Sequence, residues 1–272
     1  MSLAYRTLYA SPLVTVNDVA CSAGCGNGRH EEHCPVATLA FVRSGAFVRR
    51  DRMGRHVADA TRVVFFDPAE PYMVDHPVPG GDRCTSLAFE ASTLREAVRG
   101  GRGSRLFERA TMAGTPAIHL AHRELLAAVE GGEPVDVEDL AMELLRLCTR
   151  PEAASRADRR TIALAADAQV LLAGSFGERV TLEALAAKLG TSPFRLCRAF
   201  RAATGESLHG HLTQLRLAAA LERLPDYRDR LVDLAFELGF SSHSHFTYAF
   251  RRYYGVAPKA ALGARPSATM RG

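Results

Sequence analysis

A short segment near the N-terminus concentrates side chains that bind soft metal ions. It spans residues 21–34 and reads CSAGCGNGRHEEHC. Thiolates and imidazoles are the ligands that Zn²⁺ and Cu⁺ select in proteins. The segment therefore predicts a site for zinc or another soft metal ion, and the alternative is an unknown small-molecule effector. The candidate ligands are Cys21, Cys25, His30, His33 and Cys34, and Cys84 is a further candidate.

The spacing of this Cys/His cluster leaves three interpretations open. Cys-x3-Cys followed by His-x2-His-Cys matches no established zinc-finger spacing. A metal or metalloid site, a thiol sensor for oxidants or electrophiles, and a loop whose Cys and His side chains share no role all fit the residues. His56 and His76 lie at strand edges or turns, and we interpret both as structural or incidental.

Short strands must position the cluster. Segments rich in Val, Phe, Thr and Leu alternate with turn signals such as Asp67-Pro68 and Pro79-Gly80-Gly81. Closely spaced strands of this kind predict a small antiparallel barrel or a double-sheet jelly roll. The expected strands cover residues 13–19, 36–43, 45–50, 62–67, 72–76 and 84–90.

The hydrophobic period changes from strand-like to helical at about residue 92. We expect helices at 92–100, 116–130 and 134–149, then a linker at 151–157 and a further helix at 159–175. The apolar stripes of 116–149 can pair two subunits or pack against the barrel of the same chain. We expect a homodimer, because two copies of a binding unit on repeated sites gain from multivalency.

Composition places the chain with globular proteins. It has 272 residues, of which 47% are hydrophobic. It contains no run of 18 apolar residues that would predict a membrane span. The N-terminus lacks the basic start and apolar stretch of an export signal, so we expect a cytoplasmic protein. Six cysteines are few for a disulfide scaffold of this length, which agrees with a reducing compartment.

Charge is divided unevenly along the chain. Residues 158–272 hold 16 Lys and Arg against 10 Asp and Glu, whereas residues 1–157 hold 18 against 20. The net charges are therefore +6 and −2. A basic C-terminal part beside a slightly acidic N-terminal part predicts that only the former meets phosphates.

The C-terminal part contains the same pattern twice. The first copy includes LEALAAKLGTSPFRLCRAFRAATG and the second LVDLAFELGFSSHSHFTYAFRRYYG. Leu185 and Gly190 recur 49 residues later, but Phe200 recurs 50 residues later as Phe250, so the second copy has one extra residue in or after its turn. Glycine at the turn with helical periodicity on both sides predicts a duplicated helix-turn-helix unit.

The start and stop signals within each copy agree with this interpretation. Gly190 ends one helix, and Ser192 with Pro193 begins the next as an N-cap and a first helical residue. Residues 207–224 predict a connecting helix of about five turns, or about 27 Å, between the two units. Such a helix can hold two recognition helices near the spacing of about 34 Å between successive major-groove faces. The alternative interpretation is an ordinary helical bundle whose charged side chains are merely solvated.

These motifs resemble the AraC/XylS family of transcription regulators. The resemblance covers roughly residues 160–262 and is most specific at Gly239-Phe240, Phe246, Phe250, Gly255 and Pro258. It implies that each second helix reads bases in the major groove. The base-contacting positions it implies are Phe194, Cys197 and Arg198 in the first unit, and His243, Ser244, Thr247 and Tyr248 in the second.

Arginines beside these positions match phosphate contacts, which set register without reading sequence. They are Arg201, Arg216, Arg251 and Arg252. Arg198 is the best candidate for guanine readout, because its guanidinium fork matches O6 and N7. Tyr248 stands where the family commonly has Arg, which predicts weaker base reading by the second unit.

The resemblance also implies a cupin-like N-terminal domain that binds an effector. The expected fold is therefore α+β. An antiparallel β-barrel at 1–92 precedes a helical dimerisation and linker segment at 93–157, and an all-α DNA-binding domain with two helix-turn-helix units occupies 158–272. We expect a sequence-specific transcription regulator, an activator by family habit, that binds double-stranded DNA and RNA polymerase.

The alternative from another class is a DNA-repair methyl-acceptor enzyme. In such a protein a zinc-activated cysteine takes an alkyl group and the same DNA unit follows. Cys21-x3-Cys25 supplies half of such a four-cysteine site, but the closing Cys-x2-Cys pair is missing from the sequence. We therefore expect no enzymatic activity.

Overall fold

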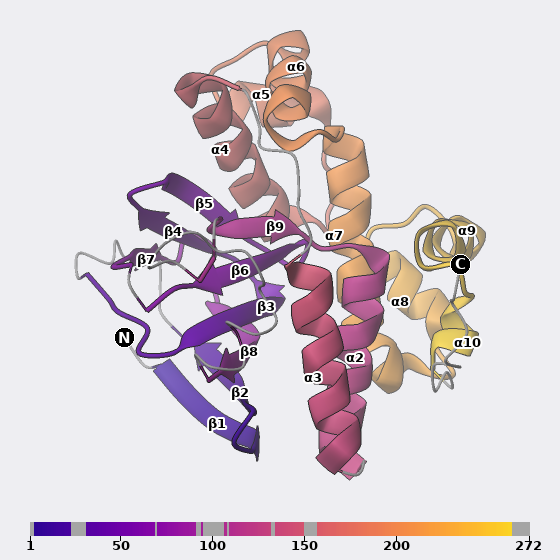
Figure 1. Cartoon of the computed structure of the whole chain (residues 1–272). Coiled ribbons are helices and arrows are strands. Elements are labelled where there is room, and N and C mark those ends of the chain that lie inside the picture. Colours follow the sequence, from indigo (N-terminus) through magenta and orange to yellow (C-terminus); the bar gives the residue numbers. More distant parts are fainter. Residues whose placement is uncertain are drawn as a thin grey trace.

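Two antiparallel sheets form the N-terminal half of the computed structural model (Figure 1). The structure describes residues 3–22, 31–68, 70–90, 94, 106–107, 109–131, 134–149 and 157–262. One sheet has the order β1 (Leu3–Ala10), β2 (Val14–Cys21), β8 (Asp82–Phe89), β3 (Ala37–Gly45), β6 (Arg62–Phe66) and β9 (Thr111–Ala113). The other has the order β5 (Gly54–Ala58), β4 (Phe47–Asp51) and β7 (Met73–Asp75).

The described strands form two sheets rather than the closed β-barrel expected from the resemblance to a cupin-like domain. The chain leaves the larger sheet at Gly45, where φ is +72°, and enters β4 of the smaller one. A side chain at Gly45 would collide with the backbone of Gly81, so the two connections cross in close contact. The antiparallel, strand-rich prediction is confirmed, and closure into a barrel is not.

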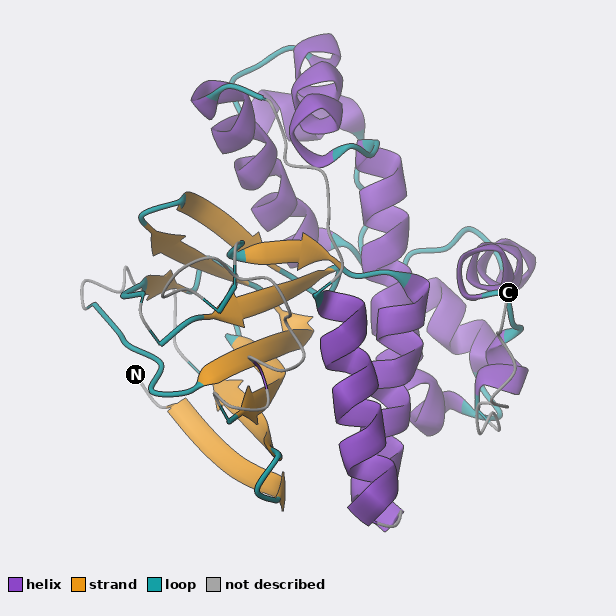
Figure 2. Ribbon diagram, in the orientation of Figure 1, coloured by secondary structure: helices purple, strands orange, loops and turns teal. Residues whose placement is uncertain are grey.

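The sheets enclose one core and carry a second on the outer face of the larger sheet. Between them lie Ala40, Val42, Phe47, Val64 and Cys84, among others. The outer face packs against α2 (Pro116–Gly131) and α3 (Pro134–Cys148). The apolar stripes of these helices, expected to pair subunits or to cover the barrel, therefore cover the sheet of the same chain (Figure 2).

The C-terminal half is helical throughout its described length. Its helices are α4 (Arg159–Ser175), α5 (Leu182–Lys188), α6 (Pro193–Thr204), α7 (Leu208–Arg223), α8 (Leu231–Glu237), α9 (His243–Tyr254) and α10 (Pro258–Ala261), with a 3-10 turn at Leu224–Tyr227. Two cores result. Leu208, Leu212 and Leu215 of α7 enter the core of the first helix pair, whereas Leu217 and Leu221 enter that of the second.

Most predicted elements lie where the sequence placed them. The expected helices at 116–130, 134–149 and 159–175 correspond to α2, α3 and α4, and all six expected strands are present. Three strands were missed, β1, β5 and β9. The helix expected at 92–100 and the linker at 151–157 fall almost wholly outside the described residues. No helix within the described ranges is both long and apolar enough to cross a membrane.

The two halves pack directly on each other. Val48 and Val57 of the smaller sheet contact Ala166 of α4, and Val78 contacts Ala173 of the same helix. On the other side, Leu120 of α2 packs against the core of α8 and α9. Both helix pairs of the C-terminal half therefore rest on the N-terminal half.

Candidate nucleic-acid interface and its links to the N-terminal half

The two helix pairs of the C-terminal half are close copies of each other. α5 and α8 each have seven residues, and α6 and α9 each have twelve. Ser192 and Ser242 cap the second helix of each pair by accepting from the backbone amide three residues on. Gly205 and Gly255 end these helices with φ of +81° and +77°. The predicted duplication is therefore a structural one.

The extra residue of the second copy lies in the turn. Gly190 and Gly239 have φ of +60° and +78°, so both turns use the left-handed geometry that glycine tolerates. Two residues separate Gly190 from the start of α6, and three separate Gly239 from the start of α9. Because the residue is added after the glycine, the first helix has the same length and ends at an equivalent glycine in both pairs.

In the first pair, the residues expected to contact bases share the exposed face of α6. Phe194 is 72% exposed, and Cys197 and Arg198 are also exposed. The Arg198 guanidinium carbon lies 5.7 Å from the centre of the Phe194 ring. Leu196 and Phe200 on the opposite face are fully buried. α6 is thus amphipathic, with the expected base-contacting residues on its exposed face, and its base contacts stay a prediction.

In the second pair, the outward face of α9 is less open. Tyr248 is 63% exposed and Ser244 is exposed, but His243 and Thr247 are half-buried. The Thr247 hydroxyl lies 3.4 Å from His243 Nε2, and Arg252 donates to the Tyr248 hydroxyl at 3.3 Å. These contacts hold the polar side chains along the helix surface.

Of the four arginines expected to contact phosphates, three are exposed and one points inward. Arg201, Arg251 and Arg252 are exposed near the C-terminal ends of α6 and α9. Arg216 instead donates to the carbonyl oxygens of Phe176 at 2.8 Å and Glu178 at 3.0 Å. These bonds tie α7 to the turn before α5. The phosphate role of Arg216 stays a prediction, and its observed contacts are structural.

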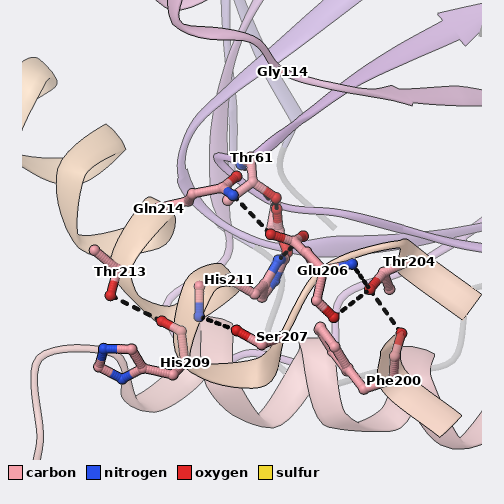
Figure 3. Close-up of polar contacts among 12 residues, drawn as sticks. Thr61, Gly114, Phe200, Thr204, Glu206, Ser207, His209, His211, Thr213 and Gln214 are labelled. Carbon is pink, nitrogen blue, oxygen red and sulfur yellow. Dashed lines mark hydrogen bonds and ion pairs between the residues drawn. The ribbon is translucent and has the colours of Figure 1, made fainter. Parts of the chain in front are cut away.

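A buried ion pair joins the C-terminal half to the sheets. His211 of α7 and Asp59, which follows β5, are both 0% exposed. His211 Nε2 lies 3.2 Å from an Asp59 carboxylate oxygen, and its Nδ1 lies 3.0 Å from Glu206 (Figure 3). Asp59 also accepts from the amide and hydroxyl of Thr61 at 2.9 and 2.6 Å. Gln214 donates to the other Glu206 oxygen at 2.7 Å.

The electrostatics of this network keep His211 charged. Burial alone would lower the pKa of His211, but the charges and hydrogen bonds of Asp59 and Glu206 outweigh it and raise the pKa to about 9. Burial likewise works against the charge of Asp59, yet His211 and Thr61 hold its pKa below the usual value. The interface therefore contains a charged pair across the two halves of the chain.

Polar contacts also anchor the second helix pair. The Tyr253 hydroxyl donates to the carbonyl of Gly114 at 3.3 Å, and the Tyr254 hydroxyl lies 3.4 Å from His119 Nδ1 of α2. Burial lowers the pKa of His119 to about 4, so this imidazole is neutral near pH 7. A second link, between Arg43 of β3 and Glu222 of α7, crosses the same interface.

The predicted Cys/His cluster is only partly described. Cys25 and His30 lie outside the described residues. His33 is exposed, and half-buried Cys34 contacts the Val36 carbonyl at 3.1 Å and the Thr38 hydroxyl at 3.3 Å. Buried Cys21 lies instead 3.4 Å from Nε2 of His76.

Two residues that the sequence analysis did not group with the cluster lie beside Cys21. His76, interpreted above as structural or incidental, and Asp82 both lie beside Cys21. Cys84, the further candidate, donates to Asp82 at 3.4 Å. The strand pattern held one usable signal, because Cys21 and Asp82 end adjacent antiparallel strands and are register partners. The position of His76 depends on the smaller sheet and had no local signal.

Comparisons with known proteins agree with the geometry of the helix pairs. Residues 185–264 match the helix-turn-helix domain family. The HTH-type transcriptional activator RhaS of Escherichia fergusonii is 32% identical over 122 residues, covering 45% of this chain and 44% of RhaS. RhaS of Citrobacter koseri is 30% identical over 147 residues, covering 50% and 51%. ToxT of Vibrio cholerae, a solved structure, aligns over 93% of this chain and 95% of ToxT with 11% identity and a TM-score of 0.36.

The paired helices and the domain match define a helix-turn-helix protein. Over this helical part the chain is similar to regulators of the AraC/XylS family. It spans about half, or less, of the length of the curated relatives it matches.

Proposed function

We propose that this protein is a sequence-specific DNA-binding transcription regulator that acts as an activator. The observation that carries the proposal is the pair of equivalent helices α6 and α9, each capped in the same way and each presenting an exposed polar face. The name of its RhaS relatives, transcriptional activators, supports the direction of regulation. Double-stranded DNA and RNA polymerase are the partners that follow, and a homodimer remains our expectation.

The two helices contribute unequally to base reading. On α6, Arg198 and Phe194 are both exposed, and an arginine fork matches the acceptor pair of guanine. On α9, Tyr248 occupies the corresponding exposed face, and His243 and Thr247 contact each other. The first unit therefore sets most of the sequence preference, and the second contributes chiefly through Arg251 and Arg252 at its C-terminal end.

The N-terminal half receives the signal. The expected effector is a soft metal ion or a thiol-reactive species at the Cys/His cluster. The signal reaches the DNA-binding helices through direct contact between the two halves of the chain. His211, which contacts Asp59, lies on α7, and α7 contributes to the cores of both helix pairs. A signal that changes how the sheets hold α7 changes the relative placement of α6 and α9.

The experiment begins with selection of bound sequences from a random-sequence duplex library by the full chain. The affinity of the selected duplex and of a scrambled duplex is then measured by fluorescence anisotropy. Arg198→Ala is expected to cost roughly 1–3 kcal/mol on the selected duplex and to relax preference at one base position. Arg52→Ala is the matched control, since it removes an exposed arginine from the β4–β5 hairpin of the N-terminal half.

Three outcomes decide the proposal. Enrichment of one sequence, with loss of that preference in Arg198→Ala alone, supports it. Equal losses on both duplexes would remove Arg198 from base reading. Failure of the wild-type chain to enrich any sequence would contradict sequence-specific binding.

A further inference from the structure

Three buried side chains that bind metal ions meet at the ends of β2, β7 and β8. Cys21, His76 and Asp82 each offer a ligand atom, and these atoms lie within 4.8 Å of one another. Their exposed fractions are 4%, 5% and 9%. A set of one thiol, one imidazole and one carboxylate in the interior needs an explanation, since polar groups are buried at a cost unless they are paired.

The fold brings these residues together from distant parts of the sequence. Cys21 and Asp82 are paired across β2 and β8. His76 directly follows β7 of the other sheet. The site thus bridges the two sheets at the end where β7 leads back to β8. Gly81 supports this closure, because a side chain there would collide with the carbonyl oxygen of Cys21.

The hydrogen bonds orient the imidazole for coordination. His76 Nδ1 donates to an Asp82 carboxylate oxygen at 2.6 Å. This bond fixes the tautomer in which the Nε2 lone pair faces Cys21 Sγ, 3.4 Å away. Metal-binding histidines in proteins are held by a carboxylate in the same way.

The separation of the two donor atoms fits one ion between them. Bond lengths of about 2.3 Å for zinc to sulfur and about 2.0 Å for zinc to nitrogen, at a tetrahedral angle, place the two donors about 3.5 Å apart. Cys21 Sγ and His76 Nε2 lie 3.4 Å apart.

We propose that Cys21 and His76 bind a soft divalent cation of the Zn²⁺ class, with Asp82 orienting the imidazole. The low exposure of all three side chains favours an ion over an organic electrophile, which needs open surface next to the thiol. The site differs from the loop cluster expected from the sequence, because two of its three residues come from the segment 76–82.

The same segment touches the DNA-binding half. Val78, two residues after His76, packs with Ala46 against Ala173 of α4. The Val78 side chain also lies next to Gly174 of that helix. A cation that draws Cys21 and His76 together acts on a segment whose other side contacts α4. We therefore assign this site as the entry point of the signal, a role that rests on the proposed function, whereas binding of the ion does not.

The first experiment measures binding alone. The full chain, reduced and freed of metal, is titrated with Co²⁺, and the thiolate-to-cobalt charge-transfer band is followed, with displacement by Zn²⁺. We expect one equivalent in the wild type and loss of the band in Cys21→Ser. Asp82→Asn, which weakens only the orientation of His76, is expected to lower affinity 10–100-fold.

Cys148→Ser is the matched control, because it removes a buried thiol of α3 in the same half of the chain, outside both the Cys/His cluster and the proposed donor set. It is expected to bind Co²⁺ like the wild type. Urea unfolding of each metal-free variant shows that a lost band is not lost folding. No band in the wild type, or equal loss in Cys148→Ser, would overturn the proposal. Alkylation of Cys21 by iodoacetamide without any cobalt binding would assign the site to thiol chemistry instead.

A second experiment tests whether metal binding at this site changes DNA binding. Affinity for the selected duplex is measured with and without Zn²⁺ in the wild type, Cys21→Ser and Val78→Ala. We expect a Zn²⁺-dependent change in the wild type that is lost in both variants. Cobalt binding with DNA affinity indifferent to Zn²⁺ would keep the site and refute its regulatory role. Cobalt binding without sequence-specific DNA binding would refute the proposed function and leave the site standing.

Discussion

The buried pair between His211 and Asp59 predicts a pH-dependent interface. Asp59→Asn keeps the size of the side chain, and its carbonyl oxygen can still accept from Thr61. It removes the charge that faces His211 Nε2 at 3.2 Å. Both side chains are 0% exposed, so solvent does not screen the loss. Removing one partner of a buried pair is strongly destabilising, because the other charge is left uncompensated.

The magnitude follows from the pKa of His211. It is raised from 6.5 to about 9, and each pKa unit corresponds to about 1.4 kcal/mol. Protonation therefore stabilises the docked protein, by roughly 3 kcal/mol at pH values below 6.5. The stabilisation falls as pH rises from 6.5 through 9, to about 2 kcal/mol at pH 7.5 and close to zero above 9.5. We expect Asp59→Asn to lose roughly 3 kcal/mol at pH 6 and less than about 1 kcal/mol at pH 9.5.

The assay is urea unfolding of the full chain and of Asp59→Asn at several pH values from 6 to 9.5, with an NMR titration of the His211 imidazole. Asp167→Asn is the matched control, since it breaks an ion pair with Arg55 across the same two halves. The Asp167 side chain is 50% exposed, so this change is expected to cost less than about 1 kcal/mol, independent of pH in this range. An unchanged difference between wild type and Asp59→Asn from pH 6 to 9.5, or titration of His211 near 6.5, would refute the reasoning.

Other substitutions test the cap, the sheet closure and the buried cation. Ser242→Ala should cost about 1 kcal/mol in thermal unfolding, because the amide at the start of α9 loses its acceptor. Gly81→Ala should cost at least about 2 kcal/mol, since φ is +77° and the new Cβ meets Cys21; a stable variant would contradict the close contact. Arg49→Ala should cost roughly 3–5 kcal/mol in urea unfolding, because the Asp51 side chain, 1% exposed, loses the guanidinium 3.0 Å away and keeps only His56 as an ion-pair partner; a loss below about 1 kcal/mol would show that the pair is dispensable.

Local signals made the helical half predictable. The cap at Ser192 and the glycines after α5 and α8 act within a few residues, so sequence alone placed the turns. The spacing of the repeat also predicted that the extra residue of the second copy lies in or after its turn. β1 was missed for a physical reason. It is an edge strand with exposed residues along most of its length, so no alternation of apolar and polar residues marks it.

The residues that join distant segments were not predictable. Cys21 and His76 are 55 positions apart, and their contact depends on how the two sheets cross. His211 and Asp59 are 152 positions apart, and a single histidine within an amphipathic helix gives no sign of a partner. The pattern of apolar residues shows which face of a single helix or strand is buried. The charge of His211 depends instead on the interface between the two halves of the chain.

His211 lies on the helix through which a change at this interface reaches both helix pairs. α7 contributes to the cores of both helix pairs, so it cannot shift without moving α6, α9 or both. The first pair is held on the sheets through α4, and the second through α2. Asp59 is the one buried charge among the described residues that reaches His211 on α7 from the N-terminal half. Release of that contact leaves Glu206 as the ion-pair partner of the charged imidazole and takes from the buried Asp59 carboxylate its cation. The arrangement therefore favours two discrete states, docked and undocked, over a graded movement.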